Sequence, residues 1–288
     1  MKNFGWVGVL AISLLAVVII GTVNYKQKNE DLGVQAAENH KNLLKRENEE
    51  KQKLIDGLNP DKNKNLSILD YLKYIEITKN ELRISVLGSS VTKGTGATSD
   101  KRNWLGVLNA KISSSFEELS LDSVNIINKN HGVGGYSIIG LLHDDIFKKV
   151  IDDKPNLIIF ESTALTSQEQ SVSIEETLKG IEKGYKQMSN SLPDTKIIIM
   201  APNPSAARLT EKNDSSLTYE DYNKAIKKFS KENKWLYFDT YSVINKRLED
   251  DKLNLYSILI DDGIHPNDMG YSIWGNELFE FISTTQIN

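Results

Sequence analysis

Residues 84–97 read ISVLGSSVTKGTGA, and this stretch decides the fold class. The mostly apolar run before Gly88 is typical of a buried strand, and Gly88 permits a tight turn directly after it. Ser89 and Ser90 follow at the strand end. Because residues just past a strand are held by a rigid scaffold, we expect these hydroxyls to face a ligand-binding cleft.

The chain after residue 82 repeats this arrangement, with short β-branched runs separated by longer amphipathic stretches. Strands are predicted at Leu82–Leu87, Val124–Asn128, Leu157–Glu161, Lys196–Ala201 and Trp235–Phe238. Helices are predicted at about 103–116, 137–150, 173–189, 218–232 and 267–283. Strands that alternate with helices of this length indicate βαβ units. We therefore expect a three-layer α/β domain, with a parallel sheet between two layers of helices.

The Ser–Gly turn after the first strand has alternative interpretations. A phosphate-binding loop would need the spacing GxxxxGK[ST], but Lys93 precedes Gly94 here, and the GxGxxG pattern is also absent. A structural turn without chemistry stays open on this segment alone. A nucleophilic serine would need a base and an acid from elsewhere in the chain.

Candidates for both lie near the carboxyl terminus, in the segment LIDDGIHPN at residues 259–267. It contains His265, one of four histidines in the chain, and Asp262 three residues earlier. In a tight loop, the Asp262 carboxylate can accept a hydrogen bond from the imidazole and fix its tautomer, as the acid of a serine triad does. A helix-capping loop is the alternative for this pattern taken alone.

A glycine-rich segment, NHGVGGYS at residues 130–137, follows the second predicted strand. Glycines at a strand exit leave backbone N–H groups free to point at an anion, as an oxyanion hole requires. A flexible βα loop without chemistry is the alternative. His131, inside this segment, is expected to line the loop or the cleft rather than to act as a base.

Taken together, the three segments resemble the SGNH/GDSL hydrolase family from residue 82 to the end of the chain. Residues 88–91 are similar to the family's GDSL block, with Ser89 where the family usually has Asp. The resemblance implies that Ser90 is the nucleophile. It also implies a flavodoxin-like sheet of five parallel strands.

The other two blocks extend the resemblance. Asn130-x-Gly132-x-x-Gly135-x-Ser137 is similar to the second block, which implies that Gly135 donates an oxyanion N–H. Asp262-x-x-His265-Pro266 is similar to the last block, which implies that these residues are the acid and the base of the triad.

The third block departs from the family pattern. After the strand at residues 157–161 the family normally presents Gly-x-Asn-Asp, in which the Asn side chain is an oxyanion donor. Here the chain reads STALTSQ, without Asn, and Leu165 or Thr166 takes its place depending on register. The Thr166 hydroxyl is a candidate substitute donor. Loss of one such donor typically lowers the rate by about 10²–10³-fold.

The resemblance implies a serine esterase that needs no metal and no cofactor. We expect an acylated carbohydrate or lipid substrate, with an O-acetyl group on a cell-envelope polysaccharide as the first candidate. Two alternatives stay open. One is an O-acyltransferase that receives acetyl from a membrane-bound acyltransferase partner and passes it to a glycan. The other is a catalytically dead glycan-binding module, in line with Ser89 and the missing Asn.

The amino terminus predicts a membrane anchor. Phe4–Val23 reads FGWVGVLAISLLAVVIIGTV and carries no charge. At about 1.5 Å per residue, such a helix would cross a bilayer core of about 30 Å. A cleaved signal peptide is the alternative, but the apolar run is long and Gly21-Thr22-Val23 is a poor cleavage site. We expect a single-pass cell-membrane protein with an extracytoplasmic catalytic domain.

From Tyr25 the composition turns to Lys, Glu, Asn and Gln, which predicts a solvated helical stalk broken near Gly57 and Pro60. A disordered linker and a coiled coil are alternatives. The predicted organisation is therefore an anchor at residues 1–24, a polar stalk at 25–66 and a hydrolase domain at 67–288.

Composition excludes several other classes of function. The chain has no cysteine, which excludes disulfides, thiolate metal sites and cysteine nucleophiles. A net charge of −4 argues against a nucleic-acid partner, because phosphate binding needs a basic face. The remaining histidines, His40, His131 and His143, lack the spacing of a metal site.

Overall fold

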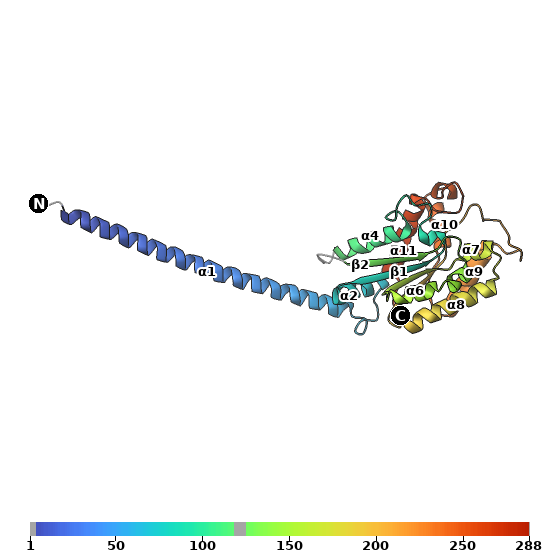
Figure 1. The fold of residues 1–288 in the computed structure, drawn as a ribbon, viewed down its shortest axis with the longest axis horizontal. Helices are drawn as coiled ribbons and strands as arrows, with labels where there is room; N and C mark the ends of the chain where they lie inside the picture. The colour runs from blue at the N-terminus through green and yellow to red at the C-terminus, as the bar shows by residue number, and fades with distance from the viewer. Residues whose placement is uncertain (1–3, 118–124, 288) are drawn as a thin grey trace. The chain divides into compact units, whose positions relative to one another are not determined.

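The computed structural model describes residues 4–117 and 125–287, and it describes side chains from residue 14 onward. Its contacts divide the chain into two units, Met1–Gly57 and Leu58–Asn288 (Figure 1). Val124, where the second strand was predicted to begin, lies outside the described residues. The two units are described separately below.

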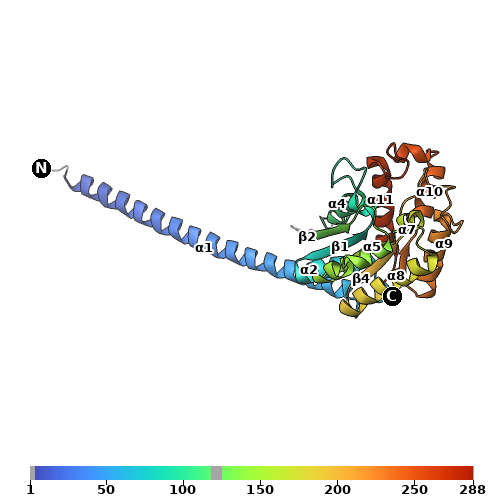
Figure 2. The same ribbon diagram turned by 45° about the vertical axis from the view of Figure 1, so that its right-hand side comes forward.

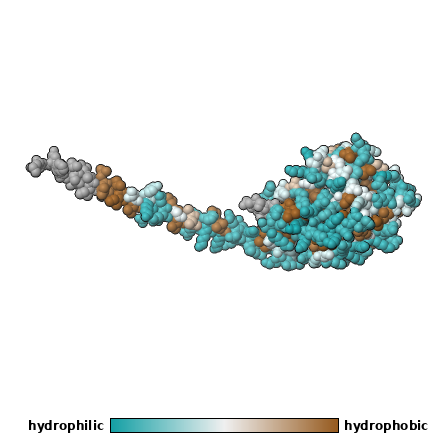
Figure 3. All heavy atoms as spheres, viewed as in Figure 1, coloured by the Kyte–Doolittle hydropathy of each residue, from teal (hydrophilic) through white to brown (hydrophobic). Residues whose placement is uncertain are grey.

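The described residues of the first unit are all helical and belong to α1 (Phe4–Leu58), which ends just before Pro60. Pro disfavours helical geometry in the residue before it, which explains the end point. Figure 3 shows apolar side chains gathered on the early part of α1, where the exposed large hydrophobics include Leu14, Leu15, Val17, Val18, Ile19 and Ile20.

The predicted anchor at residues 4–23 overlaps the first thirteen residues, whose side chains are not described. In the part of the chain that the structure describes, no helix is long and apolar enough to cross a membrane.

The second unit is built on a five-stranded sheet in the order β2-β1-β3-β4-β5, with every neighbouring pair parallel. The strands are β1 (Leu82–Gly88), β2 (Ile126–Gly132), β3 (Leu157–Glu161), β4 (Lys196–Met200) and β5 (Leu236–Phe238). This is the flavodoxin-like order, in which ligands sit beyond the carboxyl ends of the strands. The prediction of a parallel three-layer α/β/α domain is confirmed.

Helices cover both faces of the sheet (Figures 1 and 2). One hydrophobic cluster unites the sheet with α2 (Ile68–Lys79), α4 (Trp104–Glu117), α10 (Thr240–Asp250) and α11 (Asp268–Thr284). The other unites it with α5 (Ile138–His143), α6 (Ile146–Asp152), α8 (Ile174–Ser191) and α9 (Tyr219–Glu232). The shorter elements are α3 (Ser90–Lys93), α7 (Ala164–Glu169) and the 3₁₀-helix η1 (Leu255–Ile258).

Two predicted elements need correction. Strand β2 continues to Gly132, so Asn130, His131 and Gly132 belong to a strand rather than to a loop, because β2 stays in register with β1 up to Gly88. The helix predicted at 137–150 is two helices, α5 and α6. Asp145 between them has φ of 53°, a left-handed conformation that a continuous helix does not contain.

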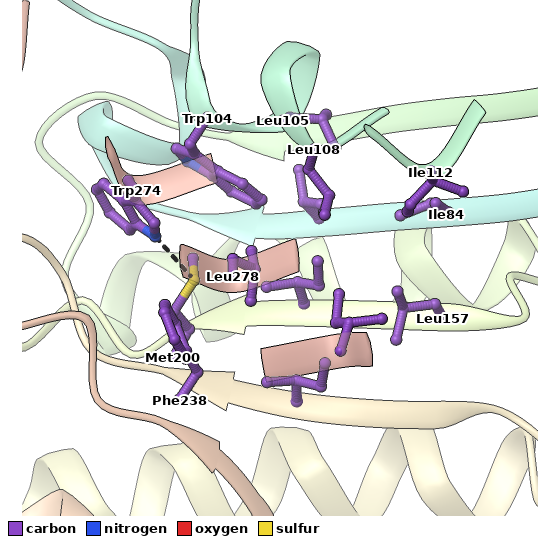
Figure 4. Close-up of a cluster of buried hydrophobic side chains, with 14 of the residues drawn as sticks. Ile84, Trp104, Leu105, Leu108, Ile112, Leu157, Met200, Phe238, Trp274 and Leu278 are labelled. Atoms are coloured by element: carbon purple, nitrogen blue, oxygen red, sulfur yellow. Dashed lines mark hydrogen bonds between the residues drawn. The ribbon is translucent and has the colours of Figure 1, made fainter. Parts of the chain in front are cut away.

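The core beneath α4 and α11 is built around two tryptophans (Figure 4). The rings of Trp104 and Trp274 stack with centroids 5.8 Å apart, and both side chains are fully buried. The Trp274 indole N–H lies 3.3 Å from the Met200 sulfur at the end of β4. This stack therefore ties both helices to the sheet at the strand ends that the site uses.

Replacing Trp274 by alanine is expected to lower the free energy of unfolding by about 3–5 kcal/mol, because it leaves a large cavity in a packed core. The measurement is the urea midpoint followed by circular dichroism. Tyr256→Ala, at an exposed side chain, is the control and should shift the midpoint little. A Trp274→Ala midpoint equal to that of wild type would contradict the assignment of this stack as a core element.

Candidate active site

The turn after β1 presents Ser90 at the start of α3. Ser89 is the N-cap of this short helix, and the carbonyl of Ser90 accepts hydrogen bonds from the N–H groups of Gly94 and Thr95 at 3.1 and 3.0 Å. Among the described residues, the N–H of Ser90 itself has no hydrogen-bond partner. A first-turn N–H without a partner is a ready donor for an anion.

The loop before α11 folds Asp262 back onto His265. One carboxylate oxygen of Asp262 accepts the N–H groups of Ile264 and His265 at 2.8 and 2.9 Å. The other lies 2.6 Å from Nδ1 of the imidazole. A residue of the segment between β4 and α9 holds this loop in place: the side-chain amide of Asn203 donates to the carbonyl of Ile264 at 2.8 Å.

The two segments meet at the carboxyl ends of the strands, although 175 positions separate them in the sequence. His265 Nε2 lies 2.8 Å from Ser90 Oγ. Because a carboxylate only accepts hydrogen bonds, the proton between His265 and Asp262 sits on Nδ1. The neutral imidazole then has a free lone pair on Nε2, which can accept the Ser90 proton.

The electrostatics of Asp262 suit this arrangement. Burial raises the pKa of its carboxyl, but the hydrogen bonds from the His265 ring and from the backbone of His265 and Ile264 outweigh it and bring the pKa below its ordinary value of 3.8. Asp262 is therefore ionised at neutral pH and can stabilise a positive charge that forms on the imidazole.

Further contacts fix the nucleophile turn against the last helix. The Tyr271 hydroxyl lies within hydrogen-bond distance of the carbonyls of Val91 and Thr95, at 3.2 and 2.7 Å. Gly96 has φ of 96°, and a Cβ there would come 2.3 Å from the Pro266 carbonyl and 3.3 Å from Cβ of His265. Only glycine fits this close approach, so Gly96 sets the spacing between the turn and the histidine loop.

The glycine segment after β2 lies beside Ser90. The N–H of Val133 donates to the carbonyl of Gly88 at 2.9 Å, and a Cβ on Gly134 would come 3.9 Å from Cβ of Ser90. Gly135 follows with φ of 75°, and its N–H has no partner among the described residues. The Gln170 amide, at the C-terminal end of α7, donates to the carbonyl of Gly135 at 2.8 Å and holds the following peptide, between Gly135 and Tyr136. The role of Gly135 as an oxyanion donor stays a prediction.

Thr166 lies inside α7 and is buried. Within the described part of the chain, no hydrogen bond joins its hydroxyl to Ser90 or His265. Its role as a substitute donor therefore stays a prediction. The residue directly before α7, Thr163, has φ of 52°, a conformation that non-glycine residues rarely adopt.

Glu161 is the last residue of β3. The structure places its fully buried carboxylate under the nucleophile turn, 2.6 Å from the N–H and 2.7 Å from the hydroxyl of Ser89. The other oxygen accepts the N–H of Thr163 at 2.7 Å. Sequence reasoning missed this link, and the one signal for it was a charged residue at the end of an otherwise apolar strand.

A second grouping of serine, histidine and aspartate differs from the first. His131 Nε2 and the Ser85 hydroxyl both contact the same oxygen of Asp153, at 2.6 and 2.9 Å. Here the serine donates to the carboxylate rather than to the imidazole, so the histidine is not placed to take its proton. This grouping joins β1, β2 and the end of α6.

Comparison with known proteins identifies the family of the chain and supports the assignment of its fold. The sequence pattern of the GDSL-like lipase/acylhydrolase family matches residues 86–273, which is well over half of the chain. The chain belongs to this family. The protein is thus an ester hydrolase by family. No curated protein matches the chain by sequence.

Solved structures resemble this GDSL-like hydrolase in fold. A catalytic mutant of an acetylxylan esterase from Geobacillus stearothermophilus is 18% identical, with a TM-score of 0.55, covering 70% of this chain and 94% of its own. A protein from Parabacteroides merdae described as a GDSL-like lipase is 15% identical, with a TM-score of 0.55, covering 71% and 96%. At these identities the likeness establishes the shared fold of the hydrolase domain.

Proposed function

We propose that the protein removes small acyl groups, O-acetyl above all, from carbohydrate esters through Ser90, His265 and Asp262. The observation that carries the proposal is the continuous chain of contacts from Ser90 Oγ to His265 Nε2 and from His265 Nδ1 to Asp262, at 2.8 and 2.6 Å. A nucleophile within hydrogen-bond reach of a base that a third group orients is the geometry of covalent serine catalysis.

In the proposed reaction, His265 takes the proton of Ser90 as Oγ attacks the ester carbonyl. The tetrahedral oxyanion is stabilised by the N–H groups of Ser90 and Gly135. As the intermediate collapses, the C–O bond to the sugar breaks and His265 returns the proton to the leaving hydroxyl. Water then attacks the acyl-serine by the same route and releases the carboxylic acid. No step requires a metal or a cofactor.

The choice of an acetylated carbohydrate draws on the fold comparison. The Geobacillus protein, described as an acetylxylan esterase, has the same sheet and helix layers over most of its length. We therefore choose an acetylated xylo-oligosaccharide as the first substrate to test.

The first experiment treats the full-length protein with a fluorophosphonate probe and locates the adduct by mass spectrometry. We expect modification of Ser90, because a serine activated by His265 reacts with this probe and an ordinary serine does not. Prior incubation with an acetylated xylo-oligosaccharide should slow the labelling. A protein without an adduct on Ser90 would contradict the proposal and favour a binding module.

A second measurement separates hydrolysis from transfer. Acetate release from the acetylated oligosaccharide is followed with and without an added unacetylated glycan. For an esterase, we expect release at the same rate in both cases, because water is the acceptor. Turnover that depends on the added glycan, with acetyl recovered on it, would instead establish an O-acyltransferase.

A further inference from the structure

The buried carboxylate of Glu161 costs folding free energy that an apolar side chain would not. It is fully buried, and among the described residues no lysine, arginine or histidine forms an ion pair with it. Burial raises the pKa of this carboxyl, and hydrogen bonds from Ser89, Thr163 and Thr92 oppose the rise. A carboxyl group buried without a cationic partner is costly unless hydrogen bonds satisfy its oxygens, and such groups concentrate at functional sites.

The two oxygens of Glu161 bind two different loops. Oε2 accepts the N–H and the hydroxyl of Ser89 in the nucleophile turn, at 2.6 and 2.7 Å. Oε1 accepts the N–H of Thr163 at 2.7 Å, in the loop between β3 and α7. The carboxylate therefore fixes the distance between the residue before the nucleophile and the loop that leads into α7.

Gly88 and Thr163 have conformations that fit this role. A Cβ on Gly88 would come 2.5 Å from Oε2 of Glu161, so glycine at this position lets the carboxylate reach the turn. Thr163 has φ of 52°, a backbone conformation that a β-branched residue rarely adopts. The hydrogen bond from its N–H to Glu161 helps to hold it there. The nucleophile turn and the loop between β3 and α7 therefore both have backbone conformations that let them bind the side chain of Glu161.

We infer that Glu161 is a positioning residue that sets the orientation of the Ser90 peptide by holding Ser89 from the neighbouring strand. Ser89 has no carboxyl group of its own, and its hydroxyl donates to Glu161, so the hydrogen-bond acceptor beneath the nucleophile turn comes from β3. With the Ser89 N–H directed to Glu161, the next N–H, that of Ser90, is left free for the oxyanion. This inference rests on the proposed serine mechanism.

The test compares Glu161→Gln, Ser89→Asp and the double variant in the full-length protein, with kcat and KM measured on p-nitrophenyl acetate. Glu161→Gln should lower kcat by about 10²-fold with KM changed little, as for loss of one oxyanion donor. The amide NH₂ cannot accept a hydrogen bond, so one of the two loops loses its anchor. Glu76→Gln, at another buried glutamate on α2, is the matched control and should retain the wild-type kcat.

The double variant separates positioning from general stability. Ser89→Asp alone places a second carboxyl group beside that of Glu161 and should lower kcat, because two like charges in one buried site repel each other. In the double variant the carboxylate has moved from β3 to the turn itself. We expect its kcat to exceed that of Glu161→Gln by at least about tenfold, because the turn again has an internal acceptor.

The outcomes separate the two proposals. A folded Glu161→Gln variant with wild-type kcat overturns the positioning role alone, whereas a wild-type protein without hydrolysis or labelling overturns the mechanism and this role together. Should Glu161→Gln not fold, Ser89→Ala tests the same link, because it removes only the 2.7 Å hydroxyl bond. A loss of about three- to tenfold in its kcat at constant KM supports the role, and an unchanged kcat overturns it.

Discussion

Replacing Ser90 or His265 by alanine is expected to lower kcat for acetyl ester hydrolysis by a factor on the order of 10⁴–10⁶. Each variant removes one end of the 2.8 Å contact through which the proton is transferred, so either change abolishes formation of the acyl-serine. Because the two residues act as a unit, the double variant should be no slower than the single ones. Steady-state kinetics on p-nitrophenyl acetate, with the fluorophosphonate label as a second readout, measure this directly.

Matched substitutions away from the site serve as controls. Ser242→Ala and His143→Ala change the same residue types at exposed positions and should leave kcat unchanged. Variants of Ser90 and His265 that keep more than about one hundredth of the wild-type kcat would contradict the serine mechanism. Losses that add in the double variant would show that the two residues act independently.

Much of the sheet could be predicted because buried parallel strands are apolar along their whole length. Strand β3 has the predicted bounds, Leu157–Glu161, and all its side chains are buried. Strand β2 lies at the edge of the sheet, and its middle residues are exposed polar side chains. Local composition therefore ended the predicted strand at Asn128, whereas pairing with β1 carries it on to Gly132.

The candidate triad could be located from sequence because its residues lie in short segments with recognisable spacing. The residues that hold the triad in place could not be located from sequence. These supporting residues form hydrogen bonds with partners between 61 and 180 positions away in the sequence, as Glu161, Tyr271 and Asn203 do. No local sequence pattern predicts such contacts. The same holds for the third block. The sequence indicated Thr166 as a candidate donor, but only the fold places it inside α7.

Replacing Asp262 by asparagine is expected to lower kcat by about 10⁴-fold while the fold is retained. The carboxylate holds the imidazole proton on Nδ1 through the 2.6 Å contact, which leaves Nε2 free to accept from Ser90. An asparagine can instead donate its NH₂ to Nδ1, and the ring proton then sits on Nε2, where it blocks the transfer. Steady-state kinetics between pH 6 and pH 8 should show the loss throughout.

The pH dependence of stability provides a separate check on Asp262. Its folded-state pKa lies below the ordinary 3.8, so its contribution to stability is present above that value and is lost as the pH falls through the folded pKa. The difference in thermal midpoint between wild type and Asp262→Asn should therefore shrink as the pH is lowered below about 4. The difference in thermal midpoint will be modest, because solvent screens the Asp262 carboxylate, whose side chain is 38% exposed. A difference that grows at low pH would mean that the contact with His265 does not stabilise the charged carboxylate, and the assignment of Asp262 as the orienting acid would be wrong.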